Sequence, residues 1–417
     1  MTNTNDRITN TQPSFHQKID CDILKEPPSL KDMGVPEVRI YSEFPLTYYG
    51  GGERLILMIY QKLRQILIQV SIVENTSHRL EKRVPEEIIK NAVGSDLKAI
   101  NFHRFGFPGF LYQDIPPLDE LTFSSNSISL IFARRIPPRS VLRKLKTSSN
   151  RFIFCLHGIA LERFRLTLFL IMVHQVVVRF QLRTLSHFAD RNIYIQCLTP
   201  NIVSYLQGRG ANERNIFLIE NQFSSNIVEI KMNNDFFKVI FIGRFNNLSK
   251  GINFLSNVIR NVNRKEANIE FVIIGTGPDH HIINKVEANV RILGNVTEEE
   301  KTNEMMNSNL GIITSNLEPY PRVALEFLTS GIPIVSTPTA GPSHIIGKDE
   351  FFGKISSFRA EEFAEDILNY YNAWHKDKLQ YYDIRLKIAE RAKEMFKVEE
   401  MLDMYSKMIF SIAKGNI

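Results

Sequence analysis

The sequence predicts an α/β protein with two domains, each built on a parallel sheet. Short apolar runs, bounded by loops and followed by helical segments, recur along the chain, as expected for strands buried in parallel sheets. The polar, turn-rich segment 223–235 separates two such series and is typical of an interdomain linker. A chain of 417 residues is also long enough to build two or three hydrophobic cores.

The composition is that of a globular protein, with 43% hydrophobic and 23% charged residues. The three cysteines, Cys21, Cys155 and Cys197, lie far apart and have no metal-ligand spacing, which favours a reducing compartment. The polar N-terminus lacks the apolar core of a signal peptide, and no apolar run reaches the ~18–20 residues that span a bilayer. We therefore expect a cytoplasmic protein.

The positive charge of the chain is concentrated in one segment. The net charge is +6, yet residues 134–191 contain twelve Lys and Arg against Glu162 and Asp190, a local charge of +10. Such a field favours polyanions, including diphosphates and anionic lipid surfaces, although a solvated basic face is the simpler interpretation. Because no nucleic-acid-binding signature accompanies it, we expect no nucleic-acid partner.

The first half of the chain begins with a polar leader, residues 1–36, which we expect to be poorly ordered. A strand at 38–41 then leads through a glycine loop at 50–52 into a helix at 55–63. Glycines between a strand and a helix bring the backbone close to a phosphate or a sugar, although a plain flexible loop fits equally well. Residues 101–127, rich in aromatics, Pro and Gly, are interpreted as a loop system.

A strand at 151–156 ends at His157, in the position where open α/β sheets bind ligands. A lone histidine there is also compatible with a packed, structural role. The apolar segment 161–178 that follows is predicted to be a helix too short to span a membrane. Burial in the core is the favoured interpretation, and an interfacial membrane contact stays open. A strand–helix–strand series over 192–220 completes this half.

The second series begins with a strand at 238–243 that ends next to Arg244. Ser249 is expected to cap a helix that starts at Lys250, and a lysine in a first helical turn suits a bound anion. Two ordinary surface cations are the alternative. The loop 275–277 after the next strand is not G-x-G-x-x-G, so a nicotinamide site is poorly supported.

Residues 309–341 read as strand, loop, helix, strand. Pro321 suits the first position of the helix, whose free N–H groups at about Arg322 and Val323 would face an anion. Glu318 precedes the helix, and Glu326 lies within it.

Burying the carboxylate of Glu326 costs free energy unless a hydrogen-bonding group, such as a ribose diol, satisfies it. An Arg322–Glu326 pair on a solvated helix face is the alternative.

This segment, EPYPRVALEFLTSGIPIVST, resembles the signature of retaining GT-B glycosyltransferases of family 4, the glycosyl transferases group 1, in which seven residues separate two glutamates. The resemblance implies that Glu318 contacts the transferred sugar and that Glu326 holds the nucleotide ribose. It also implies two Rossmann-like domains facing each other across a cleft, with a C-terminal helix that crosses back to the N-terminal domain.

Further segments extend the resemblance. Gly51-Gly52-Glu53-Arg54 is similar to a donor-lining loop of the family, which places Gly51 and Gly52 at the donor. FIFCLHG matches a strand whose histidine, here His157, approaches the sugar, and GRFNNLSKG matches a diphosphate clamp formed by Arg244 and Lys250. Asn221-Gln222 departs from the Asn-Gly that the family has at this point.

The implied domains are an acceptor-side domain at 37–222, in which the segment 101–127 forms acceptor-side loops, a donor domain at 236–378 and returning helices at 379–417. The implied reaction moves a sugar, with retention, from a nucleotide diphosphate sugar to a saccharide or lipid-linked acceptor, without metal or cofactor. The expected catalytic residues are His157, Glu318, Arg244 and Lys250, and the expected donor-binding residues are Gly51, Gly52, Arg244, Lys250, Pro321, Arg322, Val323 and Glu326.

Two alternatives stay open: a phosphorylase-type enzyme on the same fold, and a catalytically silent paralogue that acts as a scaffold. A peripheral contact between segment 134–191 and an anionic membrane is also expected.

Overall fold

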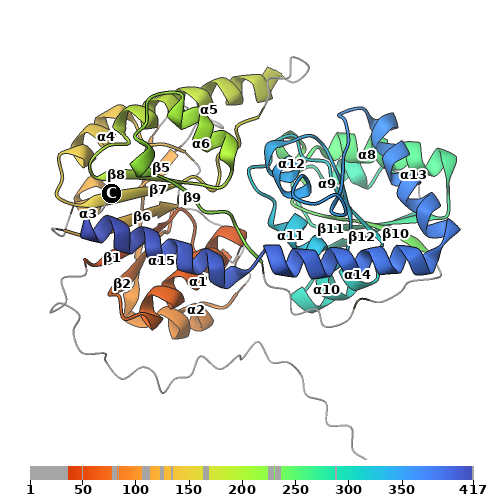
Figure 1. Ribbon diagram of the computed structural model, residues 1–417, viewed down its shortest axis with the longest axis horizontal. Helices are drawn as coiled ribbons and strands as arrows, with labels where there is room; N and C mark the ends of the chain where they lie inside the picture. The colour runs from red at the N-terminus through yellow and green to blue at the C-terminus, as the bar shows by residue number, and fades with distance from the viewer. Residues whose placement is uncertain are drawn as a thin grey trace, which may run out of the picture.

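The structure is a computed structural model that describes residues 36–48, 50–77, 82, 84–105, 113–122, 126–132, 135–162, 169–223, 230, 236–286 and 289–415. The described chain forms two α/β units, an N-terminal and a C-terminal one, each with a parallel sheet (Figure 1). This confirms the predicted fold class. The leader 1–35 and most of the linker 223–235 lie outside the described residues.

The sheet of the N-terminal unit has seven strands in the order β3-β2-β1-β6-β7-β8-β9, and the described neighbours pair in parallel. Its strands are nearly continuous apolar runs because helices cover both faces. Their bounds are Val38–Ser42 (β1), Val70–Asn75 (β2), Leu97–Ile100 (β3), Ile128–Phe132 (β6), Arg151–Cys155 (β7), Ile193–Cys197 (β8) and Ile216–Leu218 (β9).

The helices of this unit are α1 (Gly51–Gln65), α2 (Glu86–Val93), α3 (Leu118–Leu121), α4 (Arg139–Lys146), α5 (Phe169–Phe188) and α6 (Pro200–Gln207). Two short antiparallel strands, β4 (His103–Phe105) and β5 (Gln113–Ile115), come from the segment interpreted as acceptor-side loops. The glycine loop predicted at 50–52 largely belongs to α1, whose first turn begins at Gly51.

The C-terminal unit has six parallel strands in the order β12-β11-β10-β13-β14-β15. The strand order reverses between β10 and β13, and open α/β sheets bind ligands at the carboxyl ends of strands near such a reversal. The bounds are Phe237–Ile242 (β10), Ile269–Ile274 (β11), Val290–Gly294 (β12), Leu310–Ile313 (β13), Ile334–Ser336 (β14) and Gly353–Ile355 (β15).

The helices of the C-terminal unit are α7 (Asn247–Lys250), α8 (Ile252–Lys265), α9 (His280–Ile283), α10 (Glu298–Met306), α11 (Arg322–Thr329), α12 (Ala340–Ile346) and α13 (Ala360–Lys376).

Two long helices close the chain: α14 (Lys378–Met395) and α15 (Val398–Lys414). Helix α14 packs on α11 in the C-terminal unit, whereas α15 packs on α1 and buries Met401, Tyr405 and Ile409 in the core of the N-terminal unit. Figure 1 shows the two helices running along both units in succession. The tail, whose amphipathic pattern is continuous in sequence, thus joins both units.

The helix predicted at 161–178 is confirmed over 169–178 and its burial on one side only, whereas 161–162 are not helical and 163–168 lie outside the described residues. Helix α5 spans Phe169–Phe188, and residues 156–162 form no regular structure. The buried Gln175 amide explains the loop, because it accepts the N–H of Glu162 at 2.8 Å and donates to the Ala160 carbonyl at 3.0 Å. One side of α5 packs in the core, but four of its large apolar side chains are more than half exposed.

Gly331 follows α11 in the left-handed region, with φ of 69°, and a Cβ there would lie 2.5 Å from the Arg385 carbonyl oxygen. We expect Gly331→Ala to lower the free energy of unfolding by about 1–3 kcal/mol, because both the backbone and the contact are strained. Gly52→Ala is the control, since it lies inside α1 and a Cβ there meets nothing within 4 Å. Equal urea midpoints for the two variants would contradict the expectation.

Candidate active site

A cavity of about 400 Å³ lies between the two units, at the carboxyl ends of β10, β11 and β12 and the start of α11. Both units contribute to its walls. Its lining from the N-terminal unit is Tyr48, Gly50, Gly51 and Arg54, and from the C-terminal unit it is Ile242, Gly243, Arg244, Ile274, Gly275, Thr276, Gly277, Gly294, Asn295, Val296, Glu298, Lys301, Arg322, Val323 and Glu326.

Four lining residues on the C-terminal side, Gly243, Gly275, Gly277 and Gly294, are glycines and carry no side chain. Gly275 has φ of 139°, and a Cβ there would lie 1.9 Å from the Gly243 carbonyl oxygen, so the two strand-end loops touch directly. The Phe245 N–H donates to the Thr276 carbonyl at 2.8 Å and fixes the same pair of loops. The result is a wall of peptide groups that a flat or polar ligand can approach closely.

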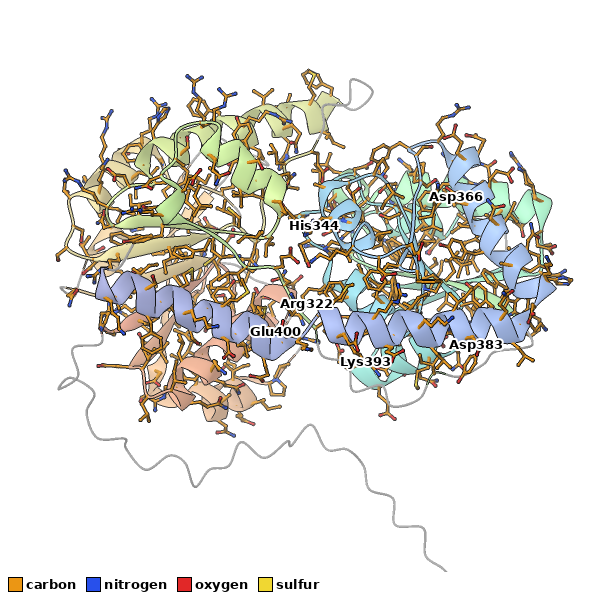
Figure 2. The ribbon with its side chains drawn as sticks, viewed as in Figure 1. Arg322, His344, Asp366, Asp383, Lys393 and Glu400 are labelled. Carbon is orange, nitrogen blue, oxygen red and sulfur yellow. The ribbon has the colours of Figure 1, made fainter. Side chains whose placement is uncertain are left out.

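Helix α11 directs its N-terminus at this cavity. Pro321 is the extended residue before the helix, one position earlier than predicted, and Arg322 and Val323 begin the helix and line the cavity. Pro321 itself is not among the lining residues. Arg322 donates through Nη1 to the Gly51 carbonyl at 2.7 Å and so spans the two units, and Figure 2 places it where they meet. The alternative of an Arg322–Glu326 pair is therefore wrong.

Glu326 instead belongs to a chain of charges along one wall. Its Oε2 lies 2.9 Å from Nζ of Lys301, which lies 2.8 Å from Glu298, which in turn pairs with Arg54 of the N-terminal unit at 2.5 Å. Burial opposes ionisation of Glu298, but the hydrogen bonds from Arg54 and Lys301 outweigh it and lower the pKa of Glu298 to about 2. Glu326 is only 9% exposed and keeps a cationic partner.

Glu318 and Lys250, two residues singled out in the sequence, form a direct ion pair. The Glu318 side chain is buried, and its Oε2 also accepts from Ser315 Oγ at 3.2 Å. The pair joins the end of α7 to the loop before α11.

The predicted cap at Ser249 is wrong, because Asn246 is the N-cap and accepts from the Ser249 N–H. Lys250 is consequently the last residue of α7, where a cation agrees with the helix dipole, and Gly251 is the N-cap of α8.

Arg244 is exposed, lines the cavity and makes no ion pair with another residue of the described ranges. Its backbone is fixed, because the Asn246 N–H donates to the Arg244 carbonyl at 2.8 Å. The backbone of Arg244 is thus ordered, and its guanidinium group is exposed to solvent in the cavity. It offers five N–H donors to an anion.

Four other predicted site residues, His157, Gly52, Lys250 and Glu318, are not among the residues that line this cavity. The His157 Nε2 lies 3.0 Å from Gln196 Oε1 and 3.1 Å from the Tyr405 hydroxyl, and its ring stacks at a tilt on Phe132. Burial lowers the pKa of His157 to about 4, so the imidazole is neutral at pH 7. The residue connects β7 and α15.

A second cavity, of about 640 Å³, adjoins the loop of Glu318. It is lined by Leu161, Glu162, Thr199, Pro200, Asn201, Asn316, Pro338, Thr339, Ala340, Ser343, His344 and Phe358. The buried Glu162 carboxylate accepts the Glu318 N–H at 3.3 Å and the Ala340 N–H at 2.9 Å.

Sequence reasoning missed Glu162, because its partners are 156 and 178 residues away and it lies beside an apolar segment. Glu298 and Lys301 were missed because an acidic first turn of a helix is typical of a solvated surface.

Glu220, at the end of the N-terminal unit, contacts three groups of the C-terminal unit. It accepts from His344 Nε2 at 2.7 Å and from the Tyr320 hydroxyl at 3.2 Å, and it pairs with Lys348. Figure 2 places His344 where the units meet. Burial opposes the charge on Glu220, but His344 and Lys348 outweigh it and lower the pKa of Glu220 to about 2.

A depressed carboxyl pKa contributes stability above the unfolded value of 4.5, and this stability is lost as pH falls towards 2. We expect Glu220→Gln to remove up to about 3 kcal/mol from the free energy of unfolding at pH 7. The difference from the unmodified protein shrinks as pH falls below 4.5. Urea unfolding between pH 7 and pH 3 measures it, with the exposed Glu299→Gln as control. A pH-independent difference would contradict the assignment.

Residues 237–373 match the family model described as "Glycosyl transferases group 1". The fold is similar to a TarM variant of S. aureus solved with fondaparinux, alpha-GlcNAc-glycerol and UDP, at TM-score 0.63 and 14% identity over 90% of this chain and 99% of that one. It is similar to HepE of Anabaena in complex with UDP, at TM-score 0.64 and 14% identity over 90% and 100%. It is also similar to sucrose-phosphate synthase of Thermosynechococcus elongatus, at TM-score 0.65 and 13% identity over 91% and 100%.

No curated protein matches the sequence significantly. The structural likeness defines the class of fold, GT-B, with two Rossmann-like units. Among the described helices, none combines the length and the apolar character needed to cross a bilayer. The described residues also include no group of three or more His, Cys, Asp or Glu arranged to hold a metal ion.

Proposed function

We propose that this protein is a family 4 glycosyltransferase that moves a sugar from a nucleoside diphosphate sugar to a hydroxyl, with retention at the anomeric carbon. The observation that carries the proposal is the 400 Å³ cavity, in which the start of α11, the cation Arg244 and the Glu326–Lys301 pair converge between two units. The matched family model covers the unit that supplies most of this cavity.

The donor is assigned to the cavity group by group. The backbone wall at 275–277 and 294–296 receives the base, and Glu326 accepts hydrogen bonds from the ribose hydroxyls. The diphosphate lies against the N–H groups of Arg322 and Val323 and between Arg244 and Lys250. Because TarM and HepE were solved with UDP, uridine diphosphate sugars are the first donors to test.

In the proposed reaction the bond between the anomeric carbon and the diphosphate oxygen breaks, and a bond to the acceptor oxygen forms on the same face of the sugar. The acceptor proton passes to the leaving diphosphate, whose charge Arg244 and Lys250 stabilise. Glu318 holds the sugar hydroxyls. His157, neutral and anchored by Gln196 and Tyr405, positions this side of the site rather than serving as a base.

We propose further that no divalent metal is required, since these cations supply the charge that a metal would supply. The second cavity, which adjoins the Glu318 loop, is the proposed site of the acceptor. Its lining is mixed, with apolar Leu161 and Phe358 beside Thr199, Asn201 and Asn316, and it suits a saccharide or a lipid-linked saccharide.

Thermal-shift measurements with UDP, GDP and ADP test the donor site, because a ligand that binds only the native state raises the melting temperature. We expect one nucleotide to give a rise of several degrees that EDTA leaves unchanged, at a concentration of about 100 times Kd. Slow release of nucleoside diphosphate from the matching sugar would establish turnover. Binding without turnover for any sugar would indicate a scaffold subunit instead, and no binding would contradict the proposal.

A further inference from the structure

Helix α5 carries an outward apolar stripe that the glycosyl-transfer site does not use. Phe169, Val173, Val176 and Phe180 follow one another at spacings of four, three and four residues, which places them on one side of the helix. Phe169 is 67% exposed and Phe180 is 61% exposed. The opposite side of the helix, with Ile171, Val178, Leu182 and Leu185, is buried in the core.

The most exposed large apolar side chains are concentrated on this helix. Among the described residues, seven large apolar side chains are more than half exposed, and four of them belong to α5. These four are Phe169, Leu170, Val176 and Phe180. A contiguous outward apolar face of this kind marks an interaction surface rather than scattered surface residues.

Cations surround the stripe. Helix α4 lies beside α5 along the upper edge of the N-terminal unit (Figure 1), and Arg139 of α4 holds its guanidinium 5.7 Å from the ring centre of Phe180. Arg143, Lys144 and Arg183 are exposed on the same two helices. Neither α4 nor α5 contains an Asp or Glu.

We propose that the α4–α5 face docks on the surface of an anionic lipid bilayer. Aromatic and aliphatic side chains enter the boundary between head groups and acyl chains, while the arginines and lysines meet lipid phosphates. A second copy of the chain fits less well, because pairing the face with itself would bring the same cations together without any carboxylate on either helix.

The proposed surface lies near the proposed acceptor cavity, and this link rests on the proposed function. Glu162 lines that cavity, and only seven peptide links join it to Phe169, a reach of at most about 25 Å. A bilayer on the α4–α5 face would therefore hold lipid-linked acceptors within reach of the cavity mouth.

Co-sedimentation with vesicles tests the docking surface without any turnover. The full chain is mixed with vesicles of phosphatidylcholine alone or of phosphatidylcholine with phosphatidylglycerol. We expect binding to the anionic vesicles that weakens with added salt, and much weaker binding to the neutral ones.

Replacing three cations together, Arg139→Gln, Arg143→Gln and Lys144→Gln, should weaken binding roughly a hundredfold, at about fivefold for each cation. Phe169→Ser with Phe180→Ser should weaken it at least about tenfold at every salt concentration.

Matched controls change the same number of exposed groups elsewhere, Phe236→Ser with Leu379→Ser for the apolar face and Arg264→Gln, Lys354→Gln and Lys387→Gln for the cations, and should leave vesicle binding unchanged. The shift in melting temperature with nucleotide should be the same in all variants, so a failed donor site and a failed docking surface are distinguishable. Equal binding to both kinds of vesicle, controls as weak as the α4–α5 variants, or a dimer in solution lost in the Phe169→Ser, Phe180→Ser variant would overturn the proposal.

Discussion

Arg244→Ala is expected to lower kcat by about a hundredfold to a thousandfold while leaving the fold intact. Loss of one group that stabilises charge on a leaving diphosphate removes about 2.7–4 kcal/mol of transition-state stabilisation. The free energy of unfolding should change by less than about 0.5 kcal/mol, because Arg244 is exposed and has no ion-pair partner within the described residues. Steady-state kinetics with the identified donor, together with urea unfolding, measure both quantities.

Arg264→Ala is the matched control for Arg244, since it removes an exposed arginine of the same unit that does not line the cavity. It should retain full activity. Arg244→Lys should recover part of the rate, because a point charge remains but the planar, two-pronged contact with phosphate is lost. Unchanged kcat in Arg244→Ala would remove this residue from the donor site.

Glu318→Gln is expected to reduce kcat by about two to three orders of magnitude and also to destabilise the protein, since it leaves Lys250 without its partner. The Glu318 side chain is 8% exposed and that of Lys250 is 26% exposed, so we expect a loss of about 1–3 kcal/mol, below the value for a fully buried pair. Lys250→Met should destabilise by a similar amount.

The double variant Glu318→Gln, Lys250→Met separates stability from catalysis. Because neither charge is then left alone, its free energy of unfolding should return to within about 1 kcal/mol of the unmodified protein. Its kcat should stay as low as that of the less active single variant. If activity returned together with stability, Glu318 would only stabilise the fold and would not bind the sugar.

The sequence predicts most of the scaffold, because buried parallel strands are apolar runs that end at glycines or polar residues. The strands at 151–155 and 310–313 and the helix that starts next to Pro321 lie within a residue or two of their expected positions. The start of helix α5 was predicted too early. Gln175, within the helix, hydrogen-bonds the backbone of Ala160 and Glu162 and so stabilises a loop before the helix. The periodicity of the sequence does not indicate that contact.

The candidate site was predictable where local motifs encode it and not where the two units meet. Arg244, Lys250, Glu318 and Glu326 come from short segments with recognisable spacing. Glu162, Glu298 and Glu220 act across the interface through partners more than a hundred residues away, and only the folded arrangement brings those partners to them. Glu326 also pairs with Lys301, a tertiary contact, and not with Arg322 as the local spacing suggested.

A crystal structure of the protein with the nucleoside diphosphate that raises its melting temperature tests the central claim most directly. We expect the diphosphate to bridge Arg244 and Lys250 at the start of α11, with the ribose on Glu326. A nucleotide bound outside the cavity, or an empty cavity at saturating nucleotide, would contradict the account.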